Sequence, residues 1–174
     1  MEKTRRCLLD LGLAACCVGL GLLLPRAFSW VENGTEVLLL LQLPVLLCGL
    51  LCGPGYGTSC GFLIYLFTFW GSGVPVGASD LWEMALYGFL AGLLTHLLNR
   101  APALLNVVGS LVGTMVLGRV FCGLMELYSQ GWEYTWGQWV HESFVVPLPG
   151  IVLQLAVIPL VTLALRRCGV AAKP

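Results

Sequence analysis

The stretch LVGTMVLGRVFCGLMELYSQG, from Leu111 to Gly131, decides the fold class. It is predominantly apolar and has the length of about 20 residues that a membrane-crossing helix needs. One arginine, Arg119, interrupts the apolar run. An arginine at membrane depth costs about 2.5 kcal/mol or more and normally faces the interior of a bundle or a wet cavity. The stretch therefore predicts a membrane helix whose arginine has a partner inside the protein.

The rest of the chain has the same character, because 58% of its 174 residues are hydrophobic, only 10% are charged, and its mean hydropathy is +0.89. So few polar residues cannot furnish a water-exposed surface. We expect an all-α integral membrane protein, with residues 1–174 forming one domain of six transmembrane helices. Proline and glycine turn signals separate the apolar segments. The expected spans are 7–24, 35–52, 55–74, 81–99, 103–126 and 147–165.

The basic residues predict the orientation of this six-helix bundle. Seven of them fall on one side of the predicted membrane: Lys3, Arg5, Arg6, Arg100, Arg166, Arg167 and Lys173. Only Arg26 falls on the other side. The positive-inside rule makes the basic side cytoplasmic. Both termini are then expected in the cytoplasm, and segments 25–34, 75–80 and 127–146 are expected outside.

Small residues recur four positions apart in several of the predicted spans. Such spacing lets helix backbones approach closely in lipid. We expect close packing at Gly53, Gly57, Gly61, Gly88, Gly92, Gly109 and Gly113. In the first span, Ala15 and Gly19 form a similar pair, which faces either the bundle or a partner protein.

The polar residues within the spans are few. Tyr65, Thr95, Asn106 and Thr114 are expected to form hydrogen bonds between helices. The eight cysteines include no Cys-x-x-Cys pair and are interpreted as small apolar residues rather than metal ligands.

Arg119 is predicted about four residues beyond the membrane midplane, or about 6 Å at 1.5 Å per residue. Its side chain should lean back toward the inner side. Glu126 lies on the same face, but about 10.5 Å along the helix, so a pocket open to the outside would satisfy both groups. The candidate substrate-binding residues around this opening are Arg119, Glu126, Glu83, Tyr87, Trp82, Gln154, Trp132, Tyr134 and Trp30.

The segment GWEYTWGQWVHESF, from Gly131 to Phe144, is rich in aromatic residues. An extended conformation places Trp132, Tyr134 and Trp136 on one face, whereas a helix places Trp132, Trp136 and Trp139 together. Either stripe fits the aromatic belt of a membrane interface. It fits equally well a lid over a flat, ring-containing ligand.

Four segments together resemble the substrate-binding S component of an energy-coupling factor (ECF) vitamin transporter. These are LPVLLCGLLCGPGYGTSCGFLIYLF (43–67), GFLAGLL (88–94), LGRVFCGL (117–124) and LPGIVLQLAVIPLV (148–161). Their order and the six-span topology, with both ends inside, carry the resemblance across residues 37–165.

The resemblance implies a multi-pass protein of the prokaryotic plasma membrane that captures a vitamin or cofactor precursor from outside. It also implies association with a transmembrane coupling subunit and two cytoplasmic ATPases. The small residues of the first span in this family meet the coupling subunit, and Ala15 and Gly19 are the matching positions here. The resemblance implies no enzymatic activity, no resident cofactor or metal and no nucleic-acid partner. Arginine favours a carboxylate, phosphate or polarised carbonyl, which leaves pantothenate, folate, riboflavin or a pyridoxine-like ligand open.

Two other classes of protein compete with this interpretation. An intramembrane enzyme would use His96, Arg119, Glu126 or Glu142, but the sequence offers no paired carboxylates and no histidine pair at ligand spacing. A structural or assembly subunit would use Arg119 only to hold its helices together. Tight binding of a small molecule by the purified protein would favour the transporter subunit over both.

Overall fold

The computed structural model describes residues 2–27, 39–71, 78–130 and 135–167. In these parts the chain is all-helical and contains no strand. The elements are α1 (Glu2–Ala27), α3 (Gln42–Cys52), α4 (Pro54–Gly71), α5 (Ala78–Leu97), α6 (Ala103–Gln130), α7 (Trp136–Val140), the π-helical turn η2 (His141–Val145) and α8 (Leu148–Arg167).

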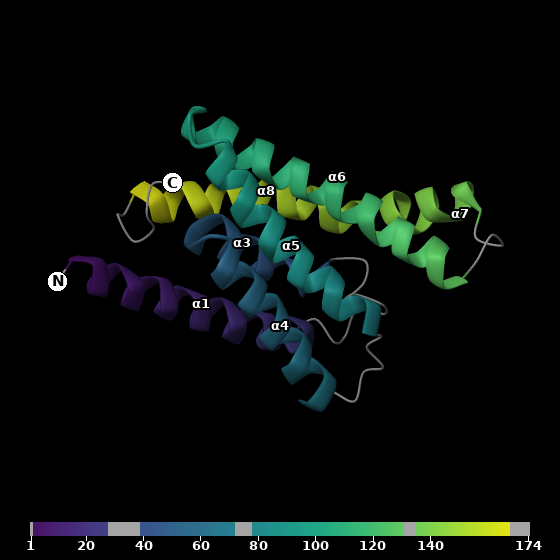
Figure 1. The fold of residues 1–174 in the computed structure, drawn as a ribbon, viewed down its shortest axis with the longest axis horizontal. Helices are drawn as coiled ribbons and strands as arrows, with labels where there is room; N and C mark the ends of the chain where they lie inside the picture. Colours follow the sequence, from purple (N-terminus) through teal and green to yellow (C-terminus); the bar gives the residue numbers. More distant parts are fainter. Residues whose placement is uncertain (1, 28–38, 72–77, 131–134, 168–174) are drawn as a thin grey trace.

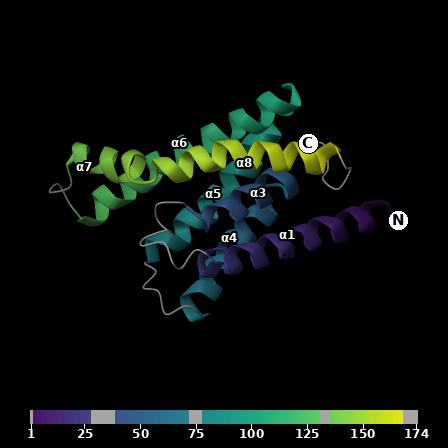
Figure 2. The same ribbon diagram turned by 180° about the vertical axis from the view of Figure 1, so that it is seen from behind.

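The helices form a layered bundle. In both ribbon views α3 and α5 lie between α1 on one side and α6 with α8 on the other, and α4 crosses α1 and extends beyond it (Figures 1 and 2). The start of α1 and the end of α8 point to the same end of the molecule, and α7 lies at the opposite end. The helix α5 packs against α3, α4 and α6, so it occupies the middle of the bundle.

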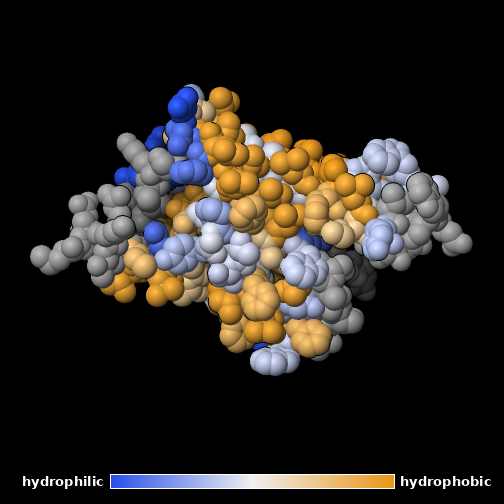
Figure 3. Space-filling model, in the orientation of Figure 1, coloured by the Kyte–Doolittle hydropathy of each residue, from blue (hydrophilic) through white to orange (hydrophobic). Residues whose placement is uncertain are grey.

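Among the described residues, three helices are long and apolar enough to cross a membrane: α1 through Cys7–Leu24, α6 through Ala103–Met125, and α8 through Leu148–Arg167. Shorter apolar helices cover Gln42–Cys52 and Leu81–Leu97. Hydrophobic residues cover much of the face shown in Figure 3, and hydrophilic ones gather at the end where α6 begins. These features are typical of a membrane protein. The six spans and the side on which the termini lie stay predictions.

The second predicted span differs from the structure, because α3 begins at Gln42 rather than near residue 35. Its 11 residues extend about 16 Å, against a hydrocarbon core of about 30 Å. Leu39 precedes it with φ 49, and its carbonyl accepts hydrogen bonds from the backbone N–H groups of Gln42 and Leu43. Residues 35–38 lie outside the described ranges. Hydropathy could not show this start, because the turn at Leu39–Leu41 is as apolar as the helix that follows.

Other helix boundaries also differ from the predicted spans, most clearly at the ends of α1 and α6. The helix α1 continues past Pro25 to Ala27, and α6 continues from the predicted end at 126 to Gln130. The predicted outer segment 127–146 therefore contains the end of α6, all of α7 and η2. Its helical part from Trp136 onward favours the helical alternative for the aromatic stripe.

The contact of α3 and α4 with α5 depends on glycine, as the four-residue spacing predicts. A Cβ atom at Gly57 would overlap the Gly88 carbonyl, and one at Gly61 would lie 2.7 Å from the Met84 carbonyl carbon. A Cβ at Gly92 would overlap the backbone at Gly53 and Pro54. The chain turns at Gly53 with φ 94, which favours glycine, and Pro54 then starts α4. Gly109 and Gly113 contact only leucine side chains, so their packing is looser.

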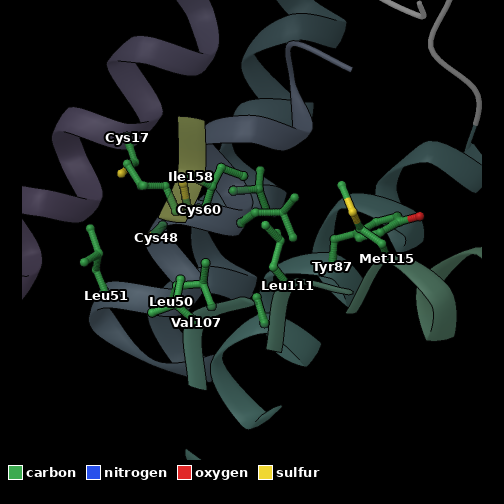
Figure 4. Packing of buried hydrophobic residues seen from close by; sticks show 14 of the residues in the cluster. Cys17, Cys48, Leu50, Leu51, Cys60, Tyr87, Val107, Leu111, Met115 and Ile158 are labelled. Atoms are coloured by element: carbon green, nitrogen blue, oxygen red, sulfur yellow. The ribbon is translucent and has the colours of Figure 1, made fainter. Parts of the chain in front are cut away.

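The apolar core lies where α1, α3, α4, α5, α6 and α8 meet (Figure 4). Cys17, Cys48 and Cys60 are buried in it among leucine, isoleucine and valine side chains. The seven described cysteines are free, and Cys168 lies outside the described residues. The Tyr87 ring lies at one edge of this core, with its oxygen pointing away from the aliphatic side chains (Figure 4).

Polar side chains also tie the helices together, at a place away from Tyr87. The Asn106 side chain donates to the Thr95 carbonyl at 2.8 Å, which confirms its predicted interhelical role. Arg166 donates to Asn106 Oδ1 and to the Leu50 carbonyl, and so joins α8 to α6 and α3. The same prediction is wrong for the Thr95 and Thr114 hydroxyls, which donate to carbonyls four residues earlier in their own helices. Threonine commonly forms this local bond, so it needs no neighbouring helix. Tyr65 stacks on Phe69 of the same helix.

Candidate ligand site

Tyr87 is the central residue of the candidate site. It is 1% exposed, and its ring packs directly on α6, where a Cβ atom at Gly118 would lie 2.7 Å from the ring. Within the described ranges its hydroxyl has no hydrogen-bond partner. Glu83 lies one helical turn before Tyr87 on α5, and Arg119 follows Gly118 on α6. The close approach at Gly118 thus places a buried hydroxyl between two helices that each carry a charged residue nearby in sequence.

Two glutamines connect this region to α3 and α8. The Gln42 side chain donates to Glu83 Oε1 at 2.9 Å, one helical turn from Tyr87 on α5. The Gln154 side chain donates to the Leu39 carbonyl at 3.1 Å, and its own Oε1 is buried without a partner among the described residues. Leu39 and Gln42 belong to the same turn. We call Gln42, Glu83, Tyr87, Arg119 and Gln154 the polar cluster.

Arg119 is 9% exposed, and its guanidinium carbon lies 6.0 Å from the centroid of the Phe144 ring. This cation–π distance is at the outer limit of such contacts, which contribute about 0.5–2 kcal/mol. A ring face accepts no conventional hydrogen bond, whereas a guanidinium carries five N–H donors. The Phe144 contact therefore leaves Arg119 able to bind an anion.

Aromatic side chains from α7 and η2 pack against the same part of α6. Trp139 lies 4.6 Å from Trp136 and meets Phe144 edge to face at 5.7 Å, measured between ring centroids. A Cβ atom at Gly123 would overlap the Trp139 indole, so this ring lies directly on the α6 backbone. The Trp139 indole N–H is buried and has no partner within the described part of the chain. These rings form a cover of aromatic surface next to Arg119.

The structure brings four of the predicted site residues into the polar cluster, namely Arg119, Glu83, Tyr87 and Gln154. Trp82 is not brought there, because its side chain is 69% exposed. It lies one position from Glu83 on α5, and the helical rotation of about 100° per residue turns it to a different face. Glu126 belongs to α6, but its side chain lies outside the described residues. Trp30, Trp132 and Tyr134 also lie outside them.

Sequence reasoning missed four residues that shape this site: Gln42, Gly118, Gly123 and Phe144. It named Trp139 only in the helical alternative for the aromatic stripe. Gln42 was the clearest available signal, since an amide in an apolar segment usually needs a partner. The two glycines flank Arg119 and Cys122 in α6, and their spacing of five does not match the four-residue pattern of helix packing. Their role depends on which rings lie over them, which the sequence does not show.

The small residues of α1 have a different environment from those of α4 and α5. A Cβ atom at Gly12 or Gly19 would meet nothing within 4 Å, and Ala15 is exposed. In contrast, a Cβ at Gly21 would lie 2.8 Å from Ile64 Cγ1 of α4. Gly12, Ala15 and Gly19, which we call the α1 small face, thus lie on the side of α1 away from its own bundle.

The described residues offer neither a metal site nor an assembled set of the predicted enzymatic groups. No group of three or more His, Cys, Asp or Glu side chains suited to a metal ion occurs within the described ranges. The predicted enzymatic candidates are not brought together by the described structure: His96 is exposed near the end of α5, and the side chains of Glu126 and Glu142 lie outside it.

Comparison of the chain with protein-family models, curated proteins and solved structures finds no match. What can be said of its function therefore depends on the site and the fold.

Proposed function

We propose that this chain is the substrate-binding subunit of a membrane importer, of the kind represented by the S components of ECF transporters. It binds a small vitamin-like molecule from outside and passes it inward together with a transmembrane coupling subunit and two ATPases. In this proposal the six segments span a prokaryotic plasma membrane, and both termini lie in the cytoplasm.

The observation that carries the proposal is the polar cluster. Hydrogen bonds join Gln42 of α3 to Glu83 of α5 and Gln154 of α8 to the turn before α3, and the Tyr87 ring of α5 packs on α6 at Gly118, next to Arg119 in the sequence. Two of them, Tyr87 and Gln154, hold buried polar atoms with no partner among the described residues. Such an atom costs about 1–3 kcal/mol when it stays unpaired. A few convergent polar groups in an apolar setting are typical of a small-molecule site.

The aromatic cover supports binding of a ring-bearing ligand rather than a purely structural role. Trp139 of α7 and Phe144 of η2 reach this part of the protein from the two short elements that follow α6. A structural arginine would be better satisfied by a carbonyl or carboxylate than by a ring. Arg166 shows that alternative in the same protein, because it donates to a backbone carbonyl and an amide oxygen.

The α1 small face supports the proposed coupling partner. Small residues allow close approach of another helix, and the bundle's own helices do not occupy this face at Gly12 and Gly19. The elongated bundle and its apolar surface also suit a subunit embedded in lipid beside a larger partner (Figure 3).

The test has two readouts. The tagged full chain is purified from its native membrane, and mass spectrometry identifies both the small molecule and the proteins that accompany it. We expect one vitamin-like compound, a polytopic coupling protein and two ATPases, and uptake of that compound in cells should require all four proteins. Purification without any small molecule, combined with uptake that is independent of this chain, would reject the proposal.

Orientation is tested separately, in a variant in which the exposed Cys7 and Cys16 are replaced by alanine. A cysteine introduced at Gly131 should react with an impermeant thiol reagent added outside intact cells. Reaction only in inverted vesicles would reverse the proposed topology.

A further inference from the structure

The polar cluster contains one acidic and one basic residue, and these come from different helices. Glu83 is on α5, one helical turn before Tyr87, and Arg119 is on α6, directly after Gly118, on which the Tyr87 ring packs. Arg119 contacts the Phe144 ring, while Glu83 accepts a hydrogen bond from Gln42. The site therefore presents both signs of charge to whatever enters beside Tyr87.

The hydrogen-bond acceptors and donors of the site also lie on different sides, as the negative and positive charges do. On the side of α3 and α8, Gln154 Oε1 is a buried acceptor without a described partner. Gln154 Nε2 donates to the Leu39 carbonyl, and Gln42 of the same turn donates to the Glu83 carboxylate. A carboxylate has about four acceptor positions, so Glu83 keeps its bond from Gln42 when it binds a further donor. On the side of α6, the Arg119 guanidinium supplies only donors. One side is thus rich in acceptors, and the other is rich in donors.

The rings next to Arg119 define a third requirement. Phe144 lies over the guanidinium, and Trp139 meets Phe144 edge to face while resting on Gly123. A planar apolar group packs well beside such rings, because offset and edge-to-face arrangements are both favourable.

We propose that the ligand is an aromatic zwitterion, a small molecule that carries a carboxylate, an ammonium group and a ring. Arg119 binds the carboxylate, Glu83 and Gln154 bind the ammonium group, and the ring packs against Phe144 and Trp139. This proposal rests on the proposed function as a substrate-binding subunit and names the class of substrate for it.

Ligands of one charge fit these residues less well. A simple anion would be attracted by Arg119 but would lie close to the Glu83 carboxylate, and like charges in a partly buried site oppose binding. A simple cation has the reverse difficulty with Arg119. Rejection of such ligands by the unmatched charge would give the site its specificity.

Two matched sets of compounds test the charge requirement on the purified full chain in detergent, by calorimetry. The first set is phenylalanine, 2-phenylethylamine and 3-phenylpropionate, and the second is tryptophan, tryptamine and indole-3-propionate. In at least one set, the amino acid should bind about 30-fold or more tightly than the amine or the acid, since each lacks one charge-assisted contact.

Variants show which residue binds which charged group of the ligand. Glu83→Gln should remove the preference for the amino acid over the matched acid, and Arg119→Gln should remove its preference over the matched amine. Phe89→Leu is a control on the exposed side of α5 and should keep the wild-type pattern. Melting curves establish that each variant is folded.

Three results would overturn the inference. These are equal binding of the acid and the amino acid by the wild-type chain, an unchanged ratio of the two in Glu83→Gln, and no binding of either set. The first two would show that Glu83 does not bind an ammonium group of the ligand, and the third would reject the ligand class. Uptake together with the coupling proteins tests the proposed function independently. If one of the amino acids binds but is not taken up, the transporter function is rejected and the ligand class stands.

Discussion

Arg119 lies in α6 between Gly118 and Gly123, the two positions at which Tyr87 and Trp139 approach the helix. A larger residue at either glycine would push a ring away from the helix surface. The local sequence thus places a guanidinium in a long apolar helix and leaves room beside it for aromatic side chains from two other elements.

Replacing Arg119 with methionine should abolish measurable binding of the ligand that co-purifies with the protein. Loss of a charge-assisted hydrogen bond to a buried anion costs about 2–5 kcal/mol, or about 30-fold to several thousand-fold in affinity. Arg119→Lys should recover only part of this loss, because an ammonium group lacks the planar pair of donors. Ligand titration measures the effect.

The melting temperature distinguishes binding from a structural role in the same experiment. Arg119→Met also removes the cost of a buried charge, so the folded protein should melt no lower than the wild type. A structural role for Arg119 predicts lower expression or stability with unchanged affinity. Unchanged affinity in a well-folded Arg119→Met protein would remove this residue from the site.

The short elements α7 and η2 contact α6 through rings, and Trp139 is the ring that rests on its backbone. Gly123→Ala should displace the indole, because the added methyl group would overlap it. We expect weaker ligand binding and greater quenching of tryptophan fluorescence by acrylamide. Gly137→Ala is the matched control within α7, since its Cβ would meet nothing within 4 Å. Equal behaviour of the two variants would show that Trp139 is not fixed at Gly123.

The contact between α4 and α5 predicts a larger effect on stability. The methyl group of Gly88→Ala would overlap the Gly57 carbonyl. This carbonyl belongs to the backbone, so it cannot move aside by a change of side-chain rotamer. Overpacking of this kind costs about 1–3 kcal/mol, so the melting temperature should fall. Gly55→Ala at the start of α4 meets nothing within 4 Å and should melt at or above the wild-type temperature. Wild-type stability of Gly88→Ala would mean that the two helices lie further apart.

The elements were predictable from the sequence to different degrees, for physical reasons. Hydropathy and turn residues located the long helices well, because Gly53-Pro54 and the segment at 98–102 interrupt apolar runs. The start of α3 was not predictable, since the left-handed turn at Leu39 changes no polarity. For the segment that forms α7 and η2, the sequence left an extended and a helical conformation open, because aromatic residues suit both.

The same limits apply to the candidate site. A buried charge such as Arg119 stands out in any apolar helix, and Glu83 and Tyr87 were found because they lie near the predicted outer opening of the bundle, among its aromatic and acidic residues. Gln42, Trp139 and Phe144 join the site through tertiary contacts made by a turn and a short helix. Such contacts depend on how elements pack rather than on local spacing.

For the whole molecule, the packed and open faces of α1 have different expected roles. Gly21 contacts Ile64 of α4, whereas Gly19, two positions earlier, has open space at its Cβ position. Cys7 also contacts the Tyr56 hydroxyl of α4 at 3.4 Å, and the Cys52 thiol of α3 donates to the Asp10 carbonyl at 3.6 Å. One side of α1 therefore holds it to the bundle, and the small face is available for a partner helix.

Leucine substitutions separate these two sides of α1. Gly19→Leu should leave the stability and ligand affinity of the isolated chain nearly unchanged, because the new side chain enters open space. It should reduce uptake and co-purification of the coupling protein at least tenfold if it displaces a close helix contact worth about 1.4 kcal/mol or more. Gly21→Leu is the matched contrast, and it should lower the melting temperature by forcing Ile64 aside. Normal uptake by a Gly19→Leu protein would place the coupling partner elsewhere on the bundle, whereas loss of ligand binding in that variant would show that Gly19 belongs to internal packing.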